Sequence, residues 1–309
     1  MSNSCMDKDW TRPTFLKSGC KINLFLEITG RLPNGYHSLD TWILPLDDPH
    51  DEITIQIENN AGSSCQVNCR ENGLDPLDNT LTKAHALFGQ NVAPLPPLRI
   101  ELHKGVPIGA GLGGGSANAA CLLLFCNSLS RKLRKKALEE DELLDLAARV
   151  GADVPFFIMN TPARASGMGE ILAPDLGPLL LLEGMTLLLV CPELRISTAW
   201  AYAAWDKMQN NPPDGLTIDH LRYRNKPALD CSPYNSLEKP IFAEYPQLAT
   251  IKNRLMEAGA EFALMSGSGS SIFGIFADPD AAQTADTAFT REGLRTYMRL
   301  FRTGASPSW

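Results

Sequence analysis

The segment LRIELHKGVPIGAGLGGGSANAACLLLFC, residues 98–126, combines an alternating stretch, a glycine cluster and a long apolar run. Residues 98–103 alternate apolar and polar side chains, which predicts a half-buried strand. From Ser116 onward, small and apolar residues continue without a breaker, which predicts a buried helix. Five glycines occupy the seven positions 109–115 between these two stretches. The segment therefore predicts a strand, a glycine-rich loop and a helix, in that order.

The glycine-rich loop is suited to bind phosphate. Glycine accepts positive φ and lets the backbone approach a ligand closely, and the start of a helix offers free N–H groups and the positive end of its dipole. No lysine follows the glycines as a Walker A loop requires, and neither His-Arg-Asp nor Asp-Phe-Gly of the protein kinases occurs. A dinucleotide fold would need an acidic strand end where this chain carries the basic run 131–136. A flexible turn is the simpler alternative, but turns rarely need five glycines between two apolar elements.

Residues 107–116, Pro-Ile-Gly-Ala-Gly-Leu-Gly-Gly-Gly-Ser, resemble the phosphate loop of the GHMP kinases, the superfamily of galactokinase, homoserine kinase and mevalonate kinase. The resemblance implies a small-molecule kinase that uses ATP and Mg²⁺, the metal reaching the Ser116 hydroxyl. It also implies an α+β fold of two lobes. Residues 1–172 would form a ribosomal-protein-like α/β lobe with the ATP site, and residues 173–309 a ferredoxin-like α/β sandwich lobe that completes the acceptor site. The residues implied for ATP are Asn79, Lys104, Pro107, Gly109, Gly111, Leu112, Gly113, Gly114, Gly115 and Ser116.

Composition limits the function classes. The 309 residues can bury one large core or two ordinary ones, and a net charge of −7 argues against a nucleic-acid or membrane-surface partner. The eight cysteines include no CxxC pair and no zinc spacing. The mixed polar first fifteen residues do not resemble a signal peptide, and the most apolar run, 179–190, is too short to cross a bilayer. We expect a cytoplasmic enzyme with small-molecule substrates, as a monomer or a homodimer.

Residues 19–28 predict a strand whose Lys21 and Asn23 share one face. Two polar groups at this spacing can converge on one ligand, although a solvated strand face is the ordinary explanation for a lysine. After the turn signal Pro-Asn-Gly come Tyr36 and His37, a pair that can stack on a base and hydrogen-bond to it, or pack at the rim of a hairpin.

The combination Lys-Ile-Asn-Leu-x-Leu followed by Gly-Tyr-His resembles one branch of the GHMP kinases, which phosphorylates a cytidyl-diphosphate sugar alcohol in non-mevalonate isoprenoid biosynthesis. In that branch the Tyr-His pair binds cytosine. The usual Arg-x-Asp-Gly turn is Leu-Pro-Asn-Gly here, and Ser236 stands where the branch has an aspartate. The residues implied for the acceptor are Asn23, Tyr36, His37, Thr198, Tyr202, Gly267 and Ser268.

Asp153 is the one carboxylate between Val150 and Ile158, in Gly-Ala-Asp-Val-Pro-Phe-Phe. A carboxylate among apolar groups should have a functional partner, but Asp153 could also cap a short helix, just as Asn79 could cap another. The segment resembles the catalytic segment of the branch, whose aspartate is the base, and the resemblance makes Lys21 its electrostatic partner. Gly167-Met168-Gly169-Glu170 matches the turn Gly-x-Gly-Glu of the same branch.

Further elements are expected along the chain. Residues 53–57 and 65–69 predict a strand pair joined by a turn at 59–62, and residues 187–190 a buried strand. A helix after Ser197 carries Trp200 and Tyr202. In the branch an aromatic of this helix closes over the cytosine; the spacing from Thr198 favours Tyr202, and core packing is an equally good explanation for it. Residues 262–273, strand–glycine turn–strand, resemble a third motif of the superfamily that folds back beside the phosphate loop, or form a plain hairpin.

Three other functions remain open on the residues alone. A different GHMP kinase would share the loop but has no use for Gly35-Tyr36-His37. A non-catalytic nucleotide sensor would not need Lys21 or Asp153. A dinucleotide oxidoreductase would need the ribose-binding carboxylate that is missing after the loop.

Overall fold

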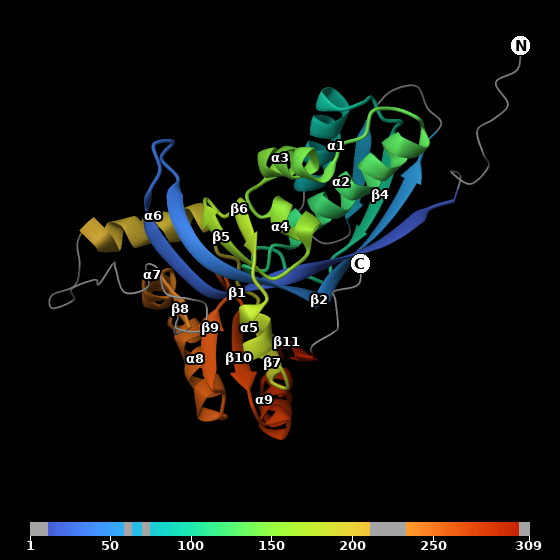
Figure 1. The fold of residues 1–309 in the computed structure, drawn as a ribbon. Helices are drawn as coiled ribbons and strands as arrows, with labels where there is room; N and C mark the ends of the chain where they lie inside the picture. The colour runs from blue at the N-terminus through green and yellow to red at the C-terminus, as the bar shows by residue number, and fades with distance from the viewer. Residues whose placement is uncertain (1–11, 59–63, 70–74, 211–232, 303–309) are drawn as a thin grey trace, which may run out of the picture.

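The computed structural model describes residues 12–58, 64–69, 75–210 and 233–302. In these ranges two β-sheets share a buried core, and helices cover their remaining faces (Figure 1). The turn predicted at 59–62 lies outside the described residues. None of the described helices combines the length and apolar character that crossing a membrane requires.

The first sheet has the order β3-β4-β2-β1-β8, with β5 paired to β2 and β6 to β5. Its long strand β2 forks: residues 52–57 pair with β4, whereas residues 39–43 pair with β5. The fork brings the loop after β4 and the turn after β5 to the same side of the sheet. The strands are β1 (Thr14–Arg31), β2 (His37–Ile57), β3 (Cys65–Cys69), β4 (Leu98–His103), β5 (Ala163–Gly167), β6 (Ile171–Pro174) and β8 (Tyr234–Asn235).

The strand–loop–helix prediction for residues 98–126 is confirmed. Leu98, Ile100 and Leu102 of β4 are buried and their neighbours are exposed, as the alternation requires. The glycine-rich loop leads directly into α2, which lies in the core of the first lobe with Ala120 and Leu123 almost fully buried. The helices of this part are α1 (Thr80–Asn91), α2 (Gly114–Lys132), α3 (Glu140–Val150) and α4 (Val154–Met159).

The predicted hairpin between residues 53–57 and 65–69 is wrong. Strand β3 pairs in parallel with β4, and β4 lies between β2 and β3. Alternation identified both strands because it is a local property, but it carries no information about which neighbour a strand selects.

The second sheet has the order β11-β7-β10-β9 and is covered on its outer face by α8 and α9. The central strand β7 is buried along its whole length, so its sequence is a continuous apolar run rather than an alternation. The elements are α5 (Gly177–Leu181), β7 (Thr186–Cys191), α6 (Thr198–Asn210), α7 (Glu238–Glu244), α8 (Pro246–Glu257), β9 (Phe262–Met265), β10 (Ile272–Phe276), α9 (Pro279–Arg291) and β11 (Arg295–Leu300).

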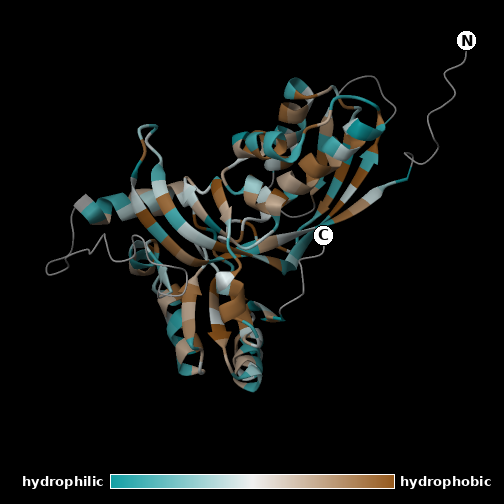
Figure 2. Ribbon diagram, viewed as in Figure 1, coloured by the Kyte–Doolittle hydropathy of each residue, from teal (hydrophilic) through white to brown (hydrophobic). Residues whose placement is uncertain are grey.

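An apolar cluster between the two sheets joins the two lobes. Alternate residues of β1 and β2 face alternate residues of β7 and β10, for example Ile22 and Leu44 with Leu189 and Phe273. Figure 2 shows this apolar character along the strands, while polar residues colour the outer surfaces of α8 and α9. Cys20, Ile22 and Leu24 of β1 enter this cluster, so Lys21 and Asn23, which alternate with them, face away from it.

Candidate active site

All the residues singled out above for catalysis, ATP and the acceptor line one cavity of about 910 Å³. The phosphate loop forms one wall of this cavity. Strand β1, the turn after it, the start of α4 and the start of α6 form the others. The sequence motifs are far apart along the chain, and the forked sheet brings them together.

The phosphate loop is fixed by backbone hydrogen bonds from both lobes. The N–H of Lys21 donates to Leu112 O at 2.9 Å, and the N–H of Ser271 donates to Ala110 O at 3.1 Å. Gly111 has φ +76°, and a Cβ at this position would lie 2.1 Å from Ser266 O. The third motif therefore packs against the loop so closely that only glycine fits there.

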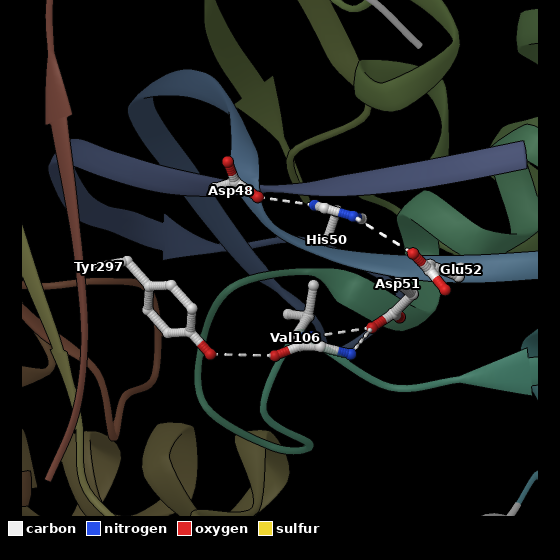
Figure 3. Close-up of polar contacts among 7 residues, drawn as sticks. Asp48, His50, Asp51, Glu52, Val106 and Tyr297 are labelled. Carbon is white, nitrogen blue, oxygen red and sulfur yellow. Dashed lines mark hydrogen bonds and ion pairs between the residues drawn. The ribbon is translucent and has the colours of Figure 1, made fainter.

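A buried carboxylate organises the entrance of the loop (Figure 3). Asp51, which is fully buried, accepts hydrogen bonds from Gly105 N at 3.0 Å and Val106 N at 2.8 Å through Oδ1. Its Oδ2 accepts from the Lys104 ammonium. The Tyr297 hydroxyl donates to Gly105 O at 3.2 Å, which ties β11 to the same segment. Asp51 thus fixes both the backbone that leads into the loop and the cation beside it.

We expect Asp51→Asn to destabilise the fold while leaving the Oδ1 contacts possible. The side chain of Lys104 is only 8% exposed, so the substitution removes the fully buried opposite charge of Asp51 from beside a buried ammonium. Loss of one partner of a buried ion pair costs about 3–5 kcal/mol. Urea unfolding measures the change. Glu292→Gln, which breaks the exposed Arg254–Glu292 pair, is the matched control and should change little. Equal, small effects of both substitutions would contradict this role of Asp51.

Lys21 and Asp153 both line the cavity and act on each other electrostatically. Burial lowers the pKa of Lys21, and the negative charge of Asp153 opposes that shift. The Lys21 ammonium donates to Asn23 Oδ1, and Asn23 Nδ2 donates to Thr41 Oγ1 at 2.8 Å. This chain of contacts holds the ammonium at a defined place, so the solvated-face explanation for Lys21, whose exposed fraction is 5%, is excluded.

Asp153 occupies the N-cap position of α4, but its side chain makes no capping hydrogen bond. Its φ and ψ of −81° and −10° are helical, whereas a capping residue ordinarily has extended dihedrals. The capping explanation therefore does not account for this carboxylate. Asn79 differs: its side chain accepts from Leu81 N and Thr82 N in a complete capping box. It lines the cavity as well, so the two explanations for Asn79 are compatible.

The other end of the cavity is aromatic. Tyr36 is 65% exposed, so most of its ring is available for stacking, whether or not its edge packs at the rim of the hairpin. Tyr202 stacks on His37 with ring centroids 4.8 Å apart and planes 20° apart. Trp200 and Tyr202 both pack against the apolar cluster of the second lobe, but Trp200 contacts Tyr245 and is not among the residues that line the cavity. Of the two aromatics left open by the sequence, Tyr202 is the one that faces the cavity.

Two contacts connect the third motif to the rest of the site. Thr198 Oγ1 and Ser268 Oγ are 3.1 Å apart, joining α6 to the glycine turn. Asn235 Nδ2 donates to Met265 O and Gly267 O, both at 2.8 Å.

Ser236, which replaces the aspartate of the branch, has a structural contact. Its hydroxyl accepts from Ile28 N at 3.0 Å. The contact is with the backbone of β1, and Ser236 is absent from the cavity lining. The replacement therefore leaves the lining of the site unchanged.

Sequence reasoning missed Asp51 and Asp206. Asp206 pairs with His37 and Arg31, and its position four residues after Tyr202 places both on one helical face, which is a signal that the sequence contains. Asp51 is buried by elements distant in sequence, and no spacing rule identifies it.

The glycine-rich phosphate loop beside a lysine and a carboxylate, in a cavity between two lobes, defines a small-molecule kinase of the GHMP type. Two family models match in the expected order: the GHMP kinases N terminal domain over residues 79–161 and the GHMP kinases C terminal model over residues 223–294. A homoserine kinase structure from Cytophaga hutchinsonii, at 16% identity and a TM-score of 0.62, shares the fold over 92% of this chain and 93% of its own.

The chain belongs to the 4-diphosphocytidyl-2-C-methyl-D-erythritol kinase family. It is 44% identical to the member of that name from Nitratidesulfovibrio vulgaris, over 92% of this chain and 98% of the relative. The member from Lawsonia intracellularis is 39% identical, over 93% and 96%. A crystal structure of a 4-(cytidine 5'-diphospho)-2C-methyl-D-erythritol kinase matches with a TM-score of 0.69 at 31% identity, over 92% of this chain and 98% of its own. The predicted family and two-lobed α+β fold are thereby confirmed.

Proposed function

We propose that this kinase transfers the γ-phosphoryl group of ATP to the 2-hydroxyl of 4-diphosphocytidyl-2-C-methyl-D-erythritol, in the non-mevalonate route to isoprenoid precursors. The observation that carries the proposal is the joint lining of one cavity by the phosphate loop, the Lys21–Asp153 pair and the Tyr36–His37–Tyr202 cluster. A phosphate site, a proton acceptor and a base-binding surface are what a nucleotide-linked alcohol acceptor requires. In this proposal residues 1–172 supply the ATP site, and residues 173–309 complete the acceptor site.

In the proposed reaction, Asp153 accepts the proton of the acceptor hydroxyl as the alcohol oxygen forms its bond to the γ-phosphorus. The bond between that phosphorus and the β–γ bridging oxygen breaks, and ADP leaves. Lys21 keeps the Asp153 carboxylate ionised and neutralises negative charge on the moving phosphoryl group. The chemistry is mainly positioning and charge neutralisation, because phosphoryl transfer has a loose transition state.

The donors in the cavity fit a magnesium ion held mainly by ATP. In the described part of the chain no group of three or more His, Cys, Asp or Glu side chains is arranged to hold a metal. Mg²⁺ commonly binds through one or two protein oxygens plus substrate phosphates and water. The Ser116 hydroxyl, at the start of α2, would be its protein ligand. When bound, the ion would neutralise charge on the phosphate oxygens.

The direct experiment is product identification. ATP, Mg²⁺ and the cytidyl-diphosphate acceptor are incubated with the enzyme, and two-dimensional ³¹P NMR locates the new phosphate ester. We expect a monophosphate at the 2-hydroxyl. A phosphate on another hydroxyl, or no product at all, would contradict the proposal.

We expect Tyr36→Ala to raise the KM of the acceptor with little change in the KM of ATP. Stacking of a base on an aromatic ring is worth about 1–3 kcal/mol, or roughly 5- to 150-fold. Phe15→Ala is the matched control, since Phe15 is equally aromatic, is 76% exposed and is absent from the cavity lining. Steady-state kinetics with both substrates varied gives the answer. An unchanged acceptor KM in folded Tyr36→Ala protein would show that stacking on Tyr36 does not contribute to acceptor binding.

A further inference from the structure

His37, which lines the acceptor end of the cavity, contacts an ion pair of Asp206 and Arg31 that lies behind the lining and that the proposed reaction does not explain. Asp206 of α6 lies against the hairpin formed by β1 and β2. Its Oδ1 is 2.9 Å from His37 Nε2, and its Oδ2 accepts from the Arg31 guanidinium. The His37 side chain is 10% exposed and that of Asp206 is 21% exposed, so the contact between them is largely shielded from water.

These contacts determine which nitrogen of His37 carries a proton. Burial raises the pKa of Asp206, but the hydrogen bonds from His37 and Arg31 outweigh it and hold the pKa below its ordinary value. The carboxylate is therefore ionised at neutral pH and can only accept. Nε2 must then be the donor. In the tautomer that carries its one ring proton on Nε2, Nδ1 keeps its lone pair.

Two aromatic rings also pack against His37. Tyr202 stacks on one face of His37 with ring centroids 4.8 Å apart, and Trp205 meets it edge-on at 5.6 Å with planes at 90°. Tyr202, Trp205 and Asp206 all come from α6, so one helix supplies both the packing and the hydrogen-bond partner of this ring.

We propose that Asp206 is a specificity-determining positioning residue: it fixes the Nε2–H tautomer of His37, so that Nδ1 accepts a hydrogen bond from an amino-bearing pyrimidine and rejects its oxo counterpart. The inference rests on the proposed function, because it assigns the base at the same site. Cytosine presents an amino donor at the position where uracil presents a carbonyl acceptor. A lone pair at Nδ1 attracts the first and repels the second. A site built to pair with an N–H discriminates strongly against an analogue that lacks it.

The test compares kcat/KM for the cytidyl-diphosphate acceptor and its uridyl analogue in the full-length enzyme. In Asp206→Asn the amide can donate to Nε2 as well as accept from it, so both tautomers become possible. We expect the cytidyl-over-uridyl preference to fall about tenfold or more through KM, with kcat changed less than about threefold. Glu292→Gln, the same chemical change in an ion pair with Arg254 outside the cavity, should retain the wild-type preference.

A spectroscopic measurement distinguishes an effect of Asp206 on the His37 tautomer from an effect of Asp206 on the stability of the fold. Long-range ¹H–¹⁵N correlation of labelled histidine should show wild-type His37 with Nε2 protonated and Nδ1 bare, assigned by the signal lost in His37→Gln. Asp206→Asn should show a mixture. Arg31→Gln removes the contact that holds Oδ2 of Asp206, so the carboxylate is placed less firmly and the preference should fall as well. This second variant also serves if Asp206→Asn does not fold.

Failure of the role of Asp206 and failure of the proposed function give different results. A protonated Nδ1 in wild type, or an unchanged cytidyl-over-uridyl ratio in folded Asp206→Asn and Arg31→Gln, overturns the role of Asp206 alone. A wild-type enzyme that phosphorylates neither compound overturns the proposed function and this inference with it.

Discussion

Asp153→Asn is expected to lower kcat by roughly 10²–10⁴-fold, the usual contribution of a positioned general base. The amide keeps the size of the carboxylate but cannot accept the hydroxyl proton. Because the Asp153 side chain makes no capping bond to α4 and no direct ion pair with Lys21, its replacement should lower the unfolding midpoint less than Asp51→Asn does, which breaks a direct buried ion pair. ATP binding should also be close to normal, since the carboxylate interacts with Lys21 and not with the loop backbone. Stopped-flow or coupled-assay kinetics with calorimetric unfolding tests both halves of the prediction.

Asp278→Ala provides the opposite pattern as a control. Asp278 caps α9 by accepting from Asp280 N at 3.0 Å, away from the cavity lining. Loss of this cap should cost about 1 kcal/mol of stability and leave kcat intact. Lys21→Met should behave like Asp153→Asn and lose mainly kcat. If Asp153→Asn keeps its turnover and unfolds more readily, then the carboxylate is structural and the base is another residue.

Gly113→Val is expected to abolish measurable ATP binding. Gly113 has φ +72°, which a β-branched residue resists. A Cβ there would also lie 2.9 Å from the Phe157 ring and 3.2 Å from Lys21 Cγ. Either the loop or these two side chains must move, and both moves disturb groups at the phosphate site. We expect affinity to fall at least about 100-fold, which corresponds to about 2.8 kcal/mol, measured by titration calorimetry.

Gly293→Val is the control that introduces backbone strain without a steric contact at the phosphate loop. Gly293 lies between α9 and β11 and has φ +85°, but a Cβ at this position would meet no other atom within 4 Å. This variant should lose stability through strain, of the order of 1–3 kcal/mol, and still bind ATP. Gly113→Ala introduces the same Cβ contact in a smaller residue and should weaken ATP binding as well. Wild-type affinity in folded Gly113→Val protein would show that the loop does not bind the phosphates.

The sequence was sufficient for the features that depend on local patterns. Alternation at 98–103, the glycine cluster and the apolar run predicted β4, the loop and α2, because each element has its own period. Partner choice between strands is not local, which is why the pairing of β3 with β4 was missed. The same limit applied to Asp51, whose importance comes from burial against the segment after β4.

For the candidate site, too, local patterns were predictable from the sequence and long-range contacts were not. Motifs identified the residues that face the cavity, but they could not decide between alternatives that depend on geometry. The helical dihedrals of Asp153 and the contact of Trp200 with Tyr245 are properties of the folded chain. Asp206 was overlooked because its partners, Arg31 and His37, belong to a hairpin far away in sequence.

The measurement that tests the central claim most directly is ADP release with a panel of acceptors. Enzyme, ATP and Mg²⁺ are combined in turn with 4-diphosphocytidyl-2-C-methyl-D-erythritol, homoserine and mevalonate, and ADP is quantified against a control without acceptor. The account predicts turnover with the cytidyl compound and only background release with the other two, since neither carries a base for Tyr36, His37 and Tyr202. Turnover of homoserine or mevalonate with none of the cytidyl compound would contradict it.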